Sequence, residues 1–248
     1  MKSLILSCAL ALSCLASSAQ AADPTYTIGS SPTGSPFTFL DIKTNKMDGV
    51  MVDLIEAIGK DAGFIPKIEP IAFSALIPAL TSKKIDLIST SMMITEERRK
   101  VVDFTLPLFP YAEGLIVPVE DRKAYKTLDD MQGMVVGVQE GTRYFDVLKA
   151  QGKFAEVKAY RSLADIIRDV ELGRIKAGFG DQPIFKYRLS QDKNAKVHLV
   201  PTYQPLVKGD IALVVRKGDE AMRERLNRSI ERLKASGTIE SLLKKWGL

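Results

Sequence analysis

Hydroxyl side chains and an arginine follow a short apolar run in the first half of the chain. The run Ile85-Asp86-Leu87-Ile88 is typical of a buried strand, and it leads into Ser89-Thr90-Ser91. Thr95-Glu96-Glu97-Arg98 then has the capping threonine and the acidic first turn of a helix. Hydroxyls and a guanidinium at the end of a strand can bind a small anion or an amine. The alternative is a surface turn in which Arg98 pairs with Glu96 or Asp103, and the spacing alone does not decide between the two.

The composition is typical of a globular protein of one or two domains. The chain has 248 residues, of which 46% are apolar and 26% are charged. The formal net charge is +5 and no run of five or six basic residues occurs, so nothing indicates a nucleic-acid partner. The two cysteines, Cys8 and Cys14, lie near the N-terminus, and the only histidine is His198. We therefore expect no disulfide, no metal site and no cofactor.

Residues 1–21 have the features of a secretory signal peptide. Lys2 supplies the positive charge, residues 4–16 form the apolar segment, and Ala19-Gln20-Ala21 is an A-x-A cleavage site. The apolar segment is too short to span a membrane. A rival interpretation is a lipoprotein signal that ends at Cys14, but Ala11 stands where a branched apolar residue is expected. We expect export to the periplasm and a mature chain that begins at Ala22.

Apolar periodicity in the mature chain predicts two β-α-β units followed by two helices. The expected strands lie near 26–30, 67–71, 85–88, 135–138, 177–181 and 197–200. The expected helices lie near 51–62, 74–80, 162–173, 185–190 and 222–237, with further helices that begin near 95 and 145 and a last one from Thr238 to Trp246. Ser74, Thr95, Ser162 and Thr238 are the predicted helix caps.

Two extended segments connect the units and predict a two-lobed α/β protein. Residues 104–118 and an apolar strand at 211–215 provide the two passages. Each lobe is expected to be a mixed sheet flanked by helices. Lobe 1 would comprise 22–111 and 210–248, and lobe 2 would comprise 112–209, with hinges near 108–113 and 206–211. Because small ligands bind between domains at the carboxyl ends of parallel strands, we expect the binding site there.

Several motifs, taken in order, resemble the polar amino acid solute-binding proteins of ABC importers. The motifs are Ala72-Phe73-Ser74-Ala75-Leu76-Ile77-Pro78-Ala79-Leu80, Lys84-Ile85-Asp86-Leu87, Ile94-Thr95-Glu96-Glu97-Arg98, Val102-Asp103-Phe104-Thr105, Val136-Gly137-Val138-Gln139-Glu140-Gly141-Thr142, Gly173-Arg174, Gly180-Asp181, Lys234-Ala235-Ser236-Gly237-Thr238 and Lys245-Trp246-Gly247. The resemblance covers essentially the whole mature chain. It implies a monomeric periplasmic binding protein with the type II two-lobed fold, which closes on its ligand and presents it to an inner-membrane permease.

The resemblance also implies roles for individual residues. Arg98 matches the arginine that binds the α-carboxylate of an amino acid. Thr142, which follows Gly141, matches the residue at a helix start in the other lobe whose backbone N–H adds to that carboxylate. Asp181 matches the carboxylate that pairs with the α-ammonium, with capping of the next helix as the alternative. Three further positions match residues that touch the ligand, namely Phe73, Thr90 and Ser91.

Three positions depart from the family pattern, and they and Arg143 bear on the ligand. Gly34 stands where an aromatic ring is frequent, which predicts open space, and Ser31 stands where relatives that bind basic amino acids carry an acid. Met93 replaces a hydroxyl residue with an adaptable apolar side chain. Arg143, next to Thr142, is expected to face the ligand side chain. We therefore expect a ligand without a cationic side chain, such as an acidic, bulky or modified amino acid.

Two other functional classes remain as alternatives. Cyclohexadienyl dehydratases resemble these binding proteins and need a carboxyl general acid in the cleft. The run Gln182-Pro183-Ile184-Phe185 after Asp181 contains no carboxylate, which argues against that enzyme. The second alternative is a ligand-presenting sensory module, although no transmembrane helix or signalling domain follows Trp246.

Overall fold

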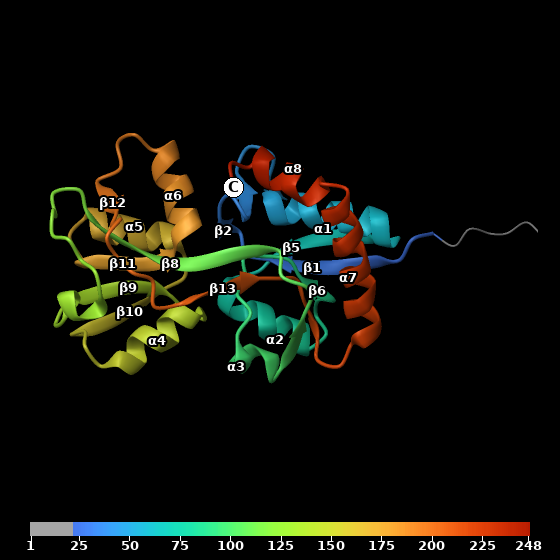
Figure 1. Cartoon of the computed structure of the whole chain (residues 1–248), viewed down its shortest axis with the longest axis horizontal. Helices are drawn as coiled ribbons and strands as arrows, with labels where there is room; N and C mark the ends of the chain where they lie inside the picture. Colours follow the sequence, from blue (N-terminus) through green and yellow to red (C-terminus); the bar gives the residue numbers. More distant parts are fainter. Residues whose placement is uncertain (1–21) are drawn as a thin grey trace, which may run out of the picture.

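The computed structural model describes residues 22–248, which form two α/β lobes side by side (Figure 1). The predicted signal peptide, with Cys14, lies outside the described residues. Within the described chain, no helix is both long enough and apolar enough to cross a membrane.

Lobe 1 is built on a five-stranded sheet with the strand order β5-β1-β6-β14-β7. The strands are β1 (Thr25–Ser30), β5 (Ile65–Pro70), β6 (Leu87–Ile88), β7 (Val102–Phe104) and β14 (Val214–Arg216). Strand β1 pairs in parallel with β5 and β6, whereas β14 runs antiparallel to β6 and β7. The parallel strands therefore end at the same edge of the sheet, where β6 runs into Ser89.

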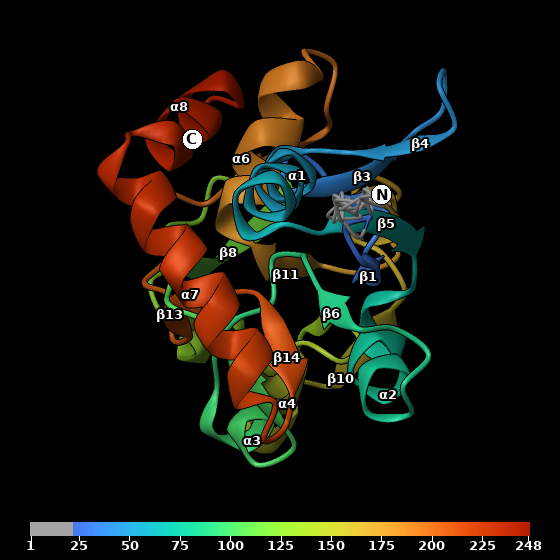
Figure 2. The same cartoon turned by 90° about the vertical axis from the view of Figure 1, so that its right-hand side faces the viewer.

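Helices cover both faces of this sheet. One face carries α1 (Val50–Ala62), α7 (Glu220–Ala235) and α8 (Thr238–Lys245), and the other carries α2 (Leu76–Thr81) (Figure 2). The apolar residues of each helix recur at helical spacing and so face the sheet. In α1 the buried stripe is formed by Leu54, Ile55 and Ile58. In α2, Leu76 and Leu80 belong to a separate core cluster. A small hairpin sheet of β2 (Thr33–Gly34), β3 (Thr38–Asp41) and β4 (Lys46–Asp48) extends this lobe.

Lobe 2 is built on a six-stranded sheet with the order β10-β9-β11-β8-β12, in which β13 also pairs with β8. The strands are β8 (Phe109–Pro118), β9 (Val135–Gln139), β10 (Glu156–Tyr160), β11 (Ala177–Asp181), β12 (Val197–Leu199) and β13 (Lys208–Ile211). Helix α4 (Arg143–Gln151) packs on β9 and β10, and α5 (Leu163–Glu171) and α6 (Gln182–Gln191) complete the lobe. Short helices η1 (Phe73–Ala75), α3 (Glu96–Arg99) and η2 (Leu128–Met131) lie in the connections.

Strands β8 and β13 form an antiparallel ribbon through which the chain passes between the two sheets. Phe109 pairs with Ile211 at one end of the ribbon and Ala112 pairs with Lys208 at the other. The single strand predicted at 211–215 is wrong, since β13 ends at Ile211 and β14 begins at Val214. The chain changes sheets between them, and Thr105 fixes this step because its hydroxyl accepts the Leu213 N–H at 3.1 Å.

Helix caps are confirmed at two of the four predicted positions. Thr95 and Ser162 each accept a backbone N–H at the start of their helices. The prediction is wrong for Ser74, because α2 begins after Ala75 and the Ser74 hydroxyl donates to Glu140 at 3.1 Å instead. It is also wrong for Thr238, which is the first residue of α8 rather than its cap. In both cases the hydroxyl contacts another residue instead of capping the helix.

Arg225 ties α7 to the end of α1, and we expect its removal to destabilise lobe 1. Its guanidinium donates to the carbonyls of Ala62 at 2.9 Å and Gly63 at 2.6 Å, and it lies over the Phe64 ring. Arg225→Ala should lower the free energy of unfolding by about 2 kcal/mol in urea titrations, because two charge-assisted hydrogen bonds are lost. Arg228→Ala is the control, since that side chain is 60% exposed and should change stability by less than about 0.5 kcal/mol. Equal effects of the two substitutions would contradict this role.

Candidate ligand site between the lobes

The carboxyl ends of parallel strands from both sheets meet between the lobes. Lobe 1 contributes the segment after β6, and lobe 2 contributes the ends of β9 and β11. The hydroxyls after β6 are buried and hold the strand end in place. Ser89 donates to the Met51 carbonyl at 2.8 Å, and the Thr90 hydroxyl lies 3.0 Å from that of Thr38. Ser91 is also buried.

Arg98 extends from α3 across the gap between the lobes. It donates to the Met93 carbonyl of its own lobe at 2.6 Å and to the Gly141 carbonyl of the opposite lobe at 3.1 Å. Its guanidinium lies 5.6 Å from the centroid of the Phe73 ring. Burial lowers the pKa of Arg98 from its usual value. Because no carboxylate within the described chain forms a salt bridge with Arg98, the surface-turn alternative is wrong.

The acids considered as partners in that alternative are paired elsewhere. Glu96 interacts with Arg99 at 3.5 Å, and Asp103 interacts with Lys217 at 2.8 Å. Arg98 therefore remains available to an anion that enters the interlobe space.

The segment from Glu140 to Arg143 meets lobe 1 closely. Thr142 caps α4, because its hydroxyl accepts the Phe145 N–H at 3.2 Å and donates to the Gln139 carbonyl. Gly141 has a φ of +73°, and a Cβ at this position would lie 2.9 Å from Ser74 Cα. Arg143 reaches Glu97 of lobe 1 at 3.5 Å, so it takes part in an interlobe ion pair. Together with the Ser74–Glu140 hydrogen bond, these contacts describe a closed arrangement of the lobes.

Asp181 ends β11 and is buried on the lobe 2 side of the gap. It is the N-cap residue of α6 by position, but its side chain makes no capping hydrogen bond, so the structure contradicts side-chain capping as its role. Instead it accepts a hydrogen bond from the Tyr144 hydroxyl at 2.8 Å. Burial raises the pKa of Asp181 to about 7, although the Tyr144 hydrogen bond and the positive charge of Arg98 oppose that rise. Burial in the closed arrangement therefore disfavours the carboxylate form of Asp181.

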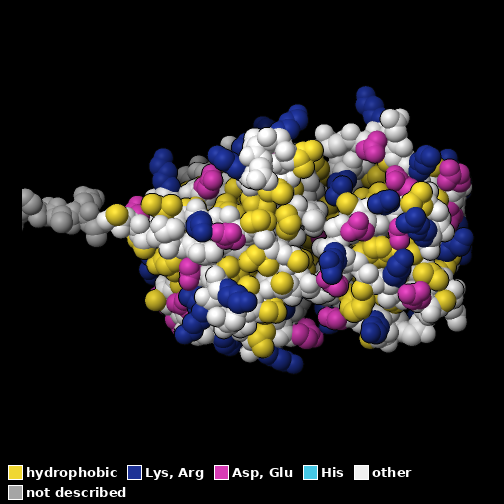
Figure 3. Space-filling model, turned by 180° about the vertical axis from the view of Figure 1, so that it is seen from behind, with side chains coloured by type: hydrophobic (Ala, Val, Ile, Leu, Met, Phe, Trp, Pro, Cys, Tyr) yellow, Lys and Arg dark blue, Asp and Glu magenta, His cyan; other side chains and the backbone are white. Residues whose placement is uncertain are grey.

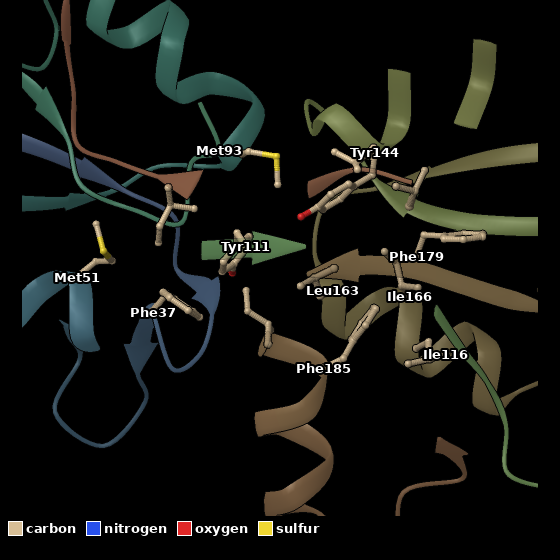
Figure 4. Close-up of a cluster of buried hydrophobic side chains, with 14 of the residues drawn as sticks. Phe37, Met51, Met93, Tyr111, Ile116, Tyr144, Leu163, Ile166, Phe179 and Phe185 are labelled. Atoms are coloured by element: carbon tan, nitrogen blue, oxygen red, sulfur yellow. The ribbon is translucent and has the colours of Figure 1, made fainter. Parts of the chain in front are cut away.

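Two tyrosines that the sequence reasoning missed project into the same space (Figure 4). Tyr144 comes from α4, and Tyr111 comes from β8 with only 4% of its surface exposed. The Tyr111 hydroxyl has no hydrogen-bond partner among the described residues. Burial raises the pKa of both hydroxyls well above the usual value, and the nearby charge of Asp181 adds to the effect. The available signals were the place of Tyr111 in the crossover segment and of Tyr144 two residues after Thr142.

The positions that depart from the family pattern are buried beside this space. Ser31 lies with its hydroxyl 3.4 Å from that of Thr33. Met93 is 5% exposed, packs against Gly209 and projects toward the gap (Figure 4). The open space expected at Gly34 is absent, because a Cβ there would lie 3.3 Å from Ile184 Cδ1. A side chain of the opposite lobe therefore fills the room that the missing ring would leave.

The model of the bacterial extracellular solute-binding proteins, family 3, matches residues 26–248. The chain belongs to this family. The ABC transporter arginine-binding protein 1 of Escherichia coli (strain K12) is 30% identical to this solute-binding protein over 219 residues, which are 88% of each chain. The structure of an ancestral arginine-binding protein bound to arginine is 32% identical, with a TM-score of 0.84 over 91% of this chain and 99% of that one.

A third similar structure bears on the enzyme alternative. It is the ancestral amino acid-binding protein described as a precursor of cyclohexadienyl dehydratase, which is 27% identical to this solute-binding protein with a TM-score of 0.81. The similarity covers 90% of this chain and 95% of that one. The solute-binding protein therefore shares its two-lobed fold with relatives that are binding proteins, including one named as the precursor of an enzyme.

We expect Gly141→Ala to oppose closure of the solute-binding protein. An alanine would meet Ser74 across the gap, besides adopting an unfavourable positive φ. Gly152→Ala is the control for the backbone effect alone, because Gly152 also has a positive φ (+61°) but no atom lies within 4 Å of an added Cβ. For whichever amino acid stabilises the unmodified protein in a thermal-shift screen, calorimetry should show an affinity loss of about tenfold or more for Gly141→Ala only. Equal losses in both variants would exclude an interlobe cause.

The raised pKa of Asp181 predicts a pH-dependent cost to the ligand-free protein. The unfolded chain ionises this carboxyl near pH 3.8 and the closed protein near pH 7, so the cost grows between these values and is constant above pH 7. At its maximum the cost is on the order of 4 kcal/mol. Asp181→Asn should therefore raise the melting temperature at pH 8 and leave it nearly unchanged at pH 4. A variant that is less stable at pH 8 would contradict the raised pKa.

Proposed function

We propose that this solute-binding protein captures an amino acid or amino-acid-like ligand by lobe closure and delivers it to an ABC permease. One observation carries the proposal. Arg98 and Asp181 have opposite charges and come from opposite lobes. Asp181 is buried and Arg98 is half-buried at the same gap, and neither forms a salt bridge with another described residue. A ligand with a carboxylate and an ammonium group supplies the missing partner for each.

The proposed binding roles follow from this geometry. Arg98 binds the α-carboxylate together with the backbone near Gly141 and Thr142, and Asp181 accepts the α-ammonium. Phe73 packs against the ligand, and Ser91, Thr90, Ser31 and Met93 form the lobe 1 wall. The free Tyr111 hydroxyl is a further hydrogen-bonding group for the ligand. Arg143 contributes to closure through Glu97 rather than to the ligand side chain, which revises the role expected for it.

Closure provides a mechanism that needs no chemical step. In the open state Arg98 and Asp181 are separated, and only a bound zwitterion bridges them, so its binding energy favours the closed state. We assign 22–111 and 210–248 to lobe 1 and 112–209 to lobe 2, with the β8–β13 ribbon at the hinges near 108–113 and 206–211. The two strands of this ribbon are the only passages between the sheets that the described chain provides, and this supports the assignment.

The site favours binding over catalysis. A cyclohexadienyl dehydratase-like reaction needs a carboxyl acid near the scissile group, and residues 182–185 supply none. Asp181, whose pKa is raised to about 7, is assigned here to the α-ammonium rather than to proton transfer. We therefore propose a binding protein of the periplasm that acts as a monomer with an inner-membrane permease. Lysines and arginines are interspersed with acids on the face in Figure 3, a pattern that gives no single-sign surface for nucleic acid.

The proposal predicts that Arg98→Ala loses ligand binding while the fold persists. We expect affinity to fall by about a hundredfold, because a charge-assisted contact is lost and the ligand carboxylate is left without its partner in the closed site. Isothermal titration calorimetry with the amino acids selected by a thermal-shift screen provides the measurement. Arg99→Ala is the matched control, since Arg99 is exposed and interacts with Glu96 outside the gap. Unchanged affinity in the Arg98 variant would remove it from the site.

A further inference from the structure

A short segment of the candidate site is built directly onto the ribbon that connects the lobes. Residues 92–94 extend along β13, where the Ile94 N–H donates to the Asp210 carbonyl at 2.8 Å and Met93 forms an antiparallel bridge with the end of the strand. Strand β13 therefore lies between this segment and β8. The same segment positions the guanidinium of the site, because Arg98 donates to the Met93 carbonyl at 2.6 Å.

Gly209 of this ribbon leaves a space that the Met93 side chain occupies. Gly209 pairs with Tyr111 across the ribbon, and residues paired in this way direct their side chains to the same face. A Cβ at Gly209 would lie 3.2 Å from Met93 Cγ and 3.3 Å from Met93 Sδ. Met93 is 5% exposed, so its thioether packs against the bare backbone of the ribbon on the face that also carries Tyr111.

The backbone conformation is not the reason for a glycine at position 209. Gly209 does not belong to the glycines with a positive φ, so the left-handed region that favours glycine is not involved. A glycine inside a strand can instead allow the close approach of a neighbouring group, or it can allow the strand to bend. The two roles predict different responses to substitution, because only the first depends on Met93.

The position of Met93 decides how much room the gap offers. Its side chain projects toward the gap, and the Tyr144 hydroxyl approaches from the opposite lobe (Figure 4). Methionine is unbranched and adaptable, so a side chain at position 209 would push the thioether off the ribbon and toward the ligand space.

We propose that Gly209 is a positioning residue that acts through Met93. It seats the thioether against the ribbon and so keeps open the part of the gap that lies between Met93 and Tyr144. The inference rests on the proposed function, since it takes Met93 and Arg98 as parts of the ligand site. It gives the ribbon a second role, because the strand that connects the lobes also shapes the site.

Methyl NMR of the ligand-free protein tests the seating of Met93 without a ligand. With isotope-labelled methionine methyl groups, the Met93 signal is assigned through Met93→Ala. Gly209→Ala should then move or broaden the Met93 signal more than that of any other methionine. Lys208→Ala, an exposed substitution in the same strand, should leave the signal in place. An unmoved Met93 signal in Gly209→Ala would overturn the inference.

A double-substitution cycle measured by calorimetry tests the effect on binding. L-Serine, L-glutamine and L-arginine are the probes, because they share the amino acid group and differ in size. For each probe that binds the unmodified protein, Gly209→Ala should lower affinity by at least about fivefold, since the crowded thioether moves into the site. In the Met93→Ala background the same glycine substitution should change affinity by less than about twofold. Equal losses in both backgrounds would show that Gly209 acts only through bending of the ribbon and would overturn the inference.

The outcomes separate this inference from the proposed function. Loss of binding in Arg98→Ala with unchanged affinity in Gly209→Ala would overturn the positioning role and leave the proposed function standing. If Gly209→Ala does not fold, the inference requires that its combination with Met93→Ala does, because removing the thioether removes the overlap. Failure of both variants to fold would overturn the inference. Failure of every probe to bind the unmodified protein would count against both proposals.

Discussion

The closed arrangement brings together two groups of opposite charge from different lobes, of which Asp181 is buried and Arg98 is half-buried. Arg98 satisfies its donors with backbone carbonyls, one of them across the gap, and Asp181 relies on a neutral tyrosine hydroxyl. Hydrogen bonds to neutral groups compensate a buried charge less well than an ion of opposite sign does. Burial lowers the pKa of Arg98 and raises the pKa of Asp181, so the charged form of each group is disfavoured. In the proposed function a zwitterionic ligand supplies the missing opposite charge at both positions, and this would couple ligand binding to closure.

The surrounding structure allows such a closed state to form. Gly141 brings the backbone of lobe 2 against Ser74, where a Cβ would not fit, and the resulting proximity lets Arg98 reach a carbonyl of the opposite lobe. The Ser74–Glu140 and Glu97–Arg143 contacts lie at the same boundary. These contacts are exposed or partly exposed and each contributes little free energy, so they favour closure without locking it. The ribbon of β8 and β13 keeps the lobes connected through only two strands, an arrangement suited to hinge motion.

In the proposed function, ligand choice depends on the half of the gap away from Arg98. Ile184 fills the place of the missing ring at Gly34, and Ser31 supplies no charge there. If Arg98 and Asp181 hold the amino acid group as proposed, residues on the Ser31 and Gly34 side of the gap would determine the side-chain specificity.

The sequence by itself determined the two-unit α/β order, most element positions and the caps at Thr95 and Ser162, because periodicity and capping act over a few residues. Its motifs also indicated Arg98 and Asp181. Only the tertiary structure decided what those side chains meet. Arg98 donates to a carbonyl 43 residues away, and Tyr111 and Tyr144 reach the site from different elements. Ser74 donates to Glu140 instead of capping its own helix. Contacts between the lobes depend on how the two main sheets are placed relative to one another. Local sequence patterns do not determine that placement, because they act over only a few residues.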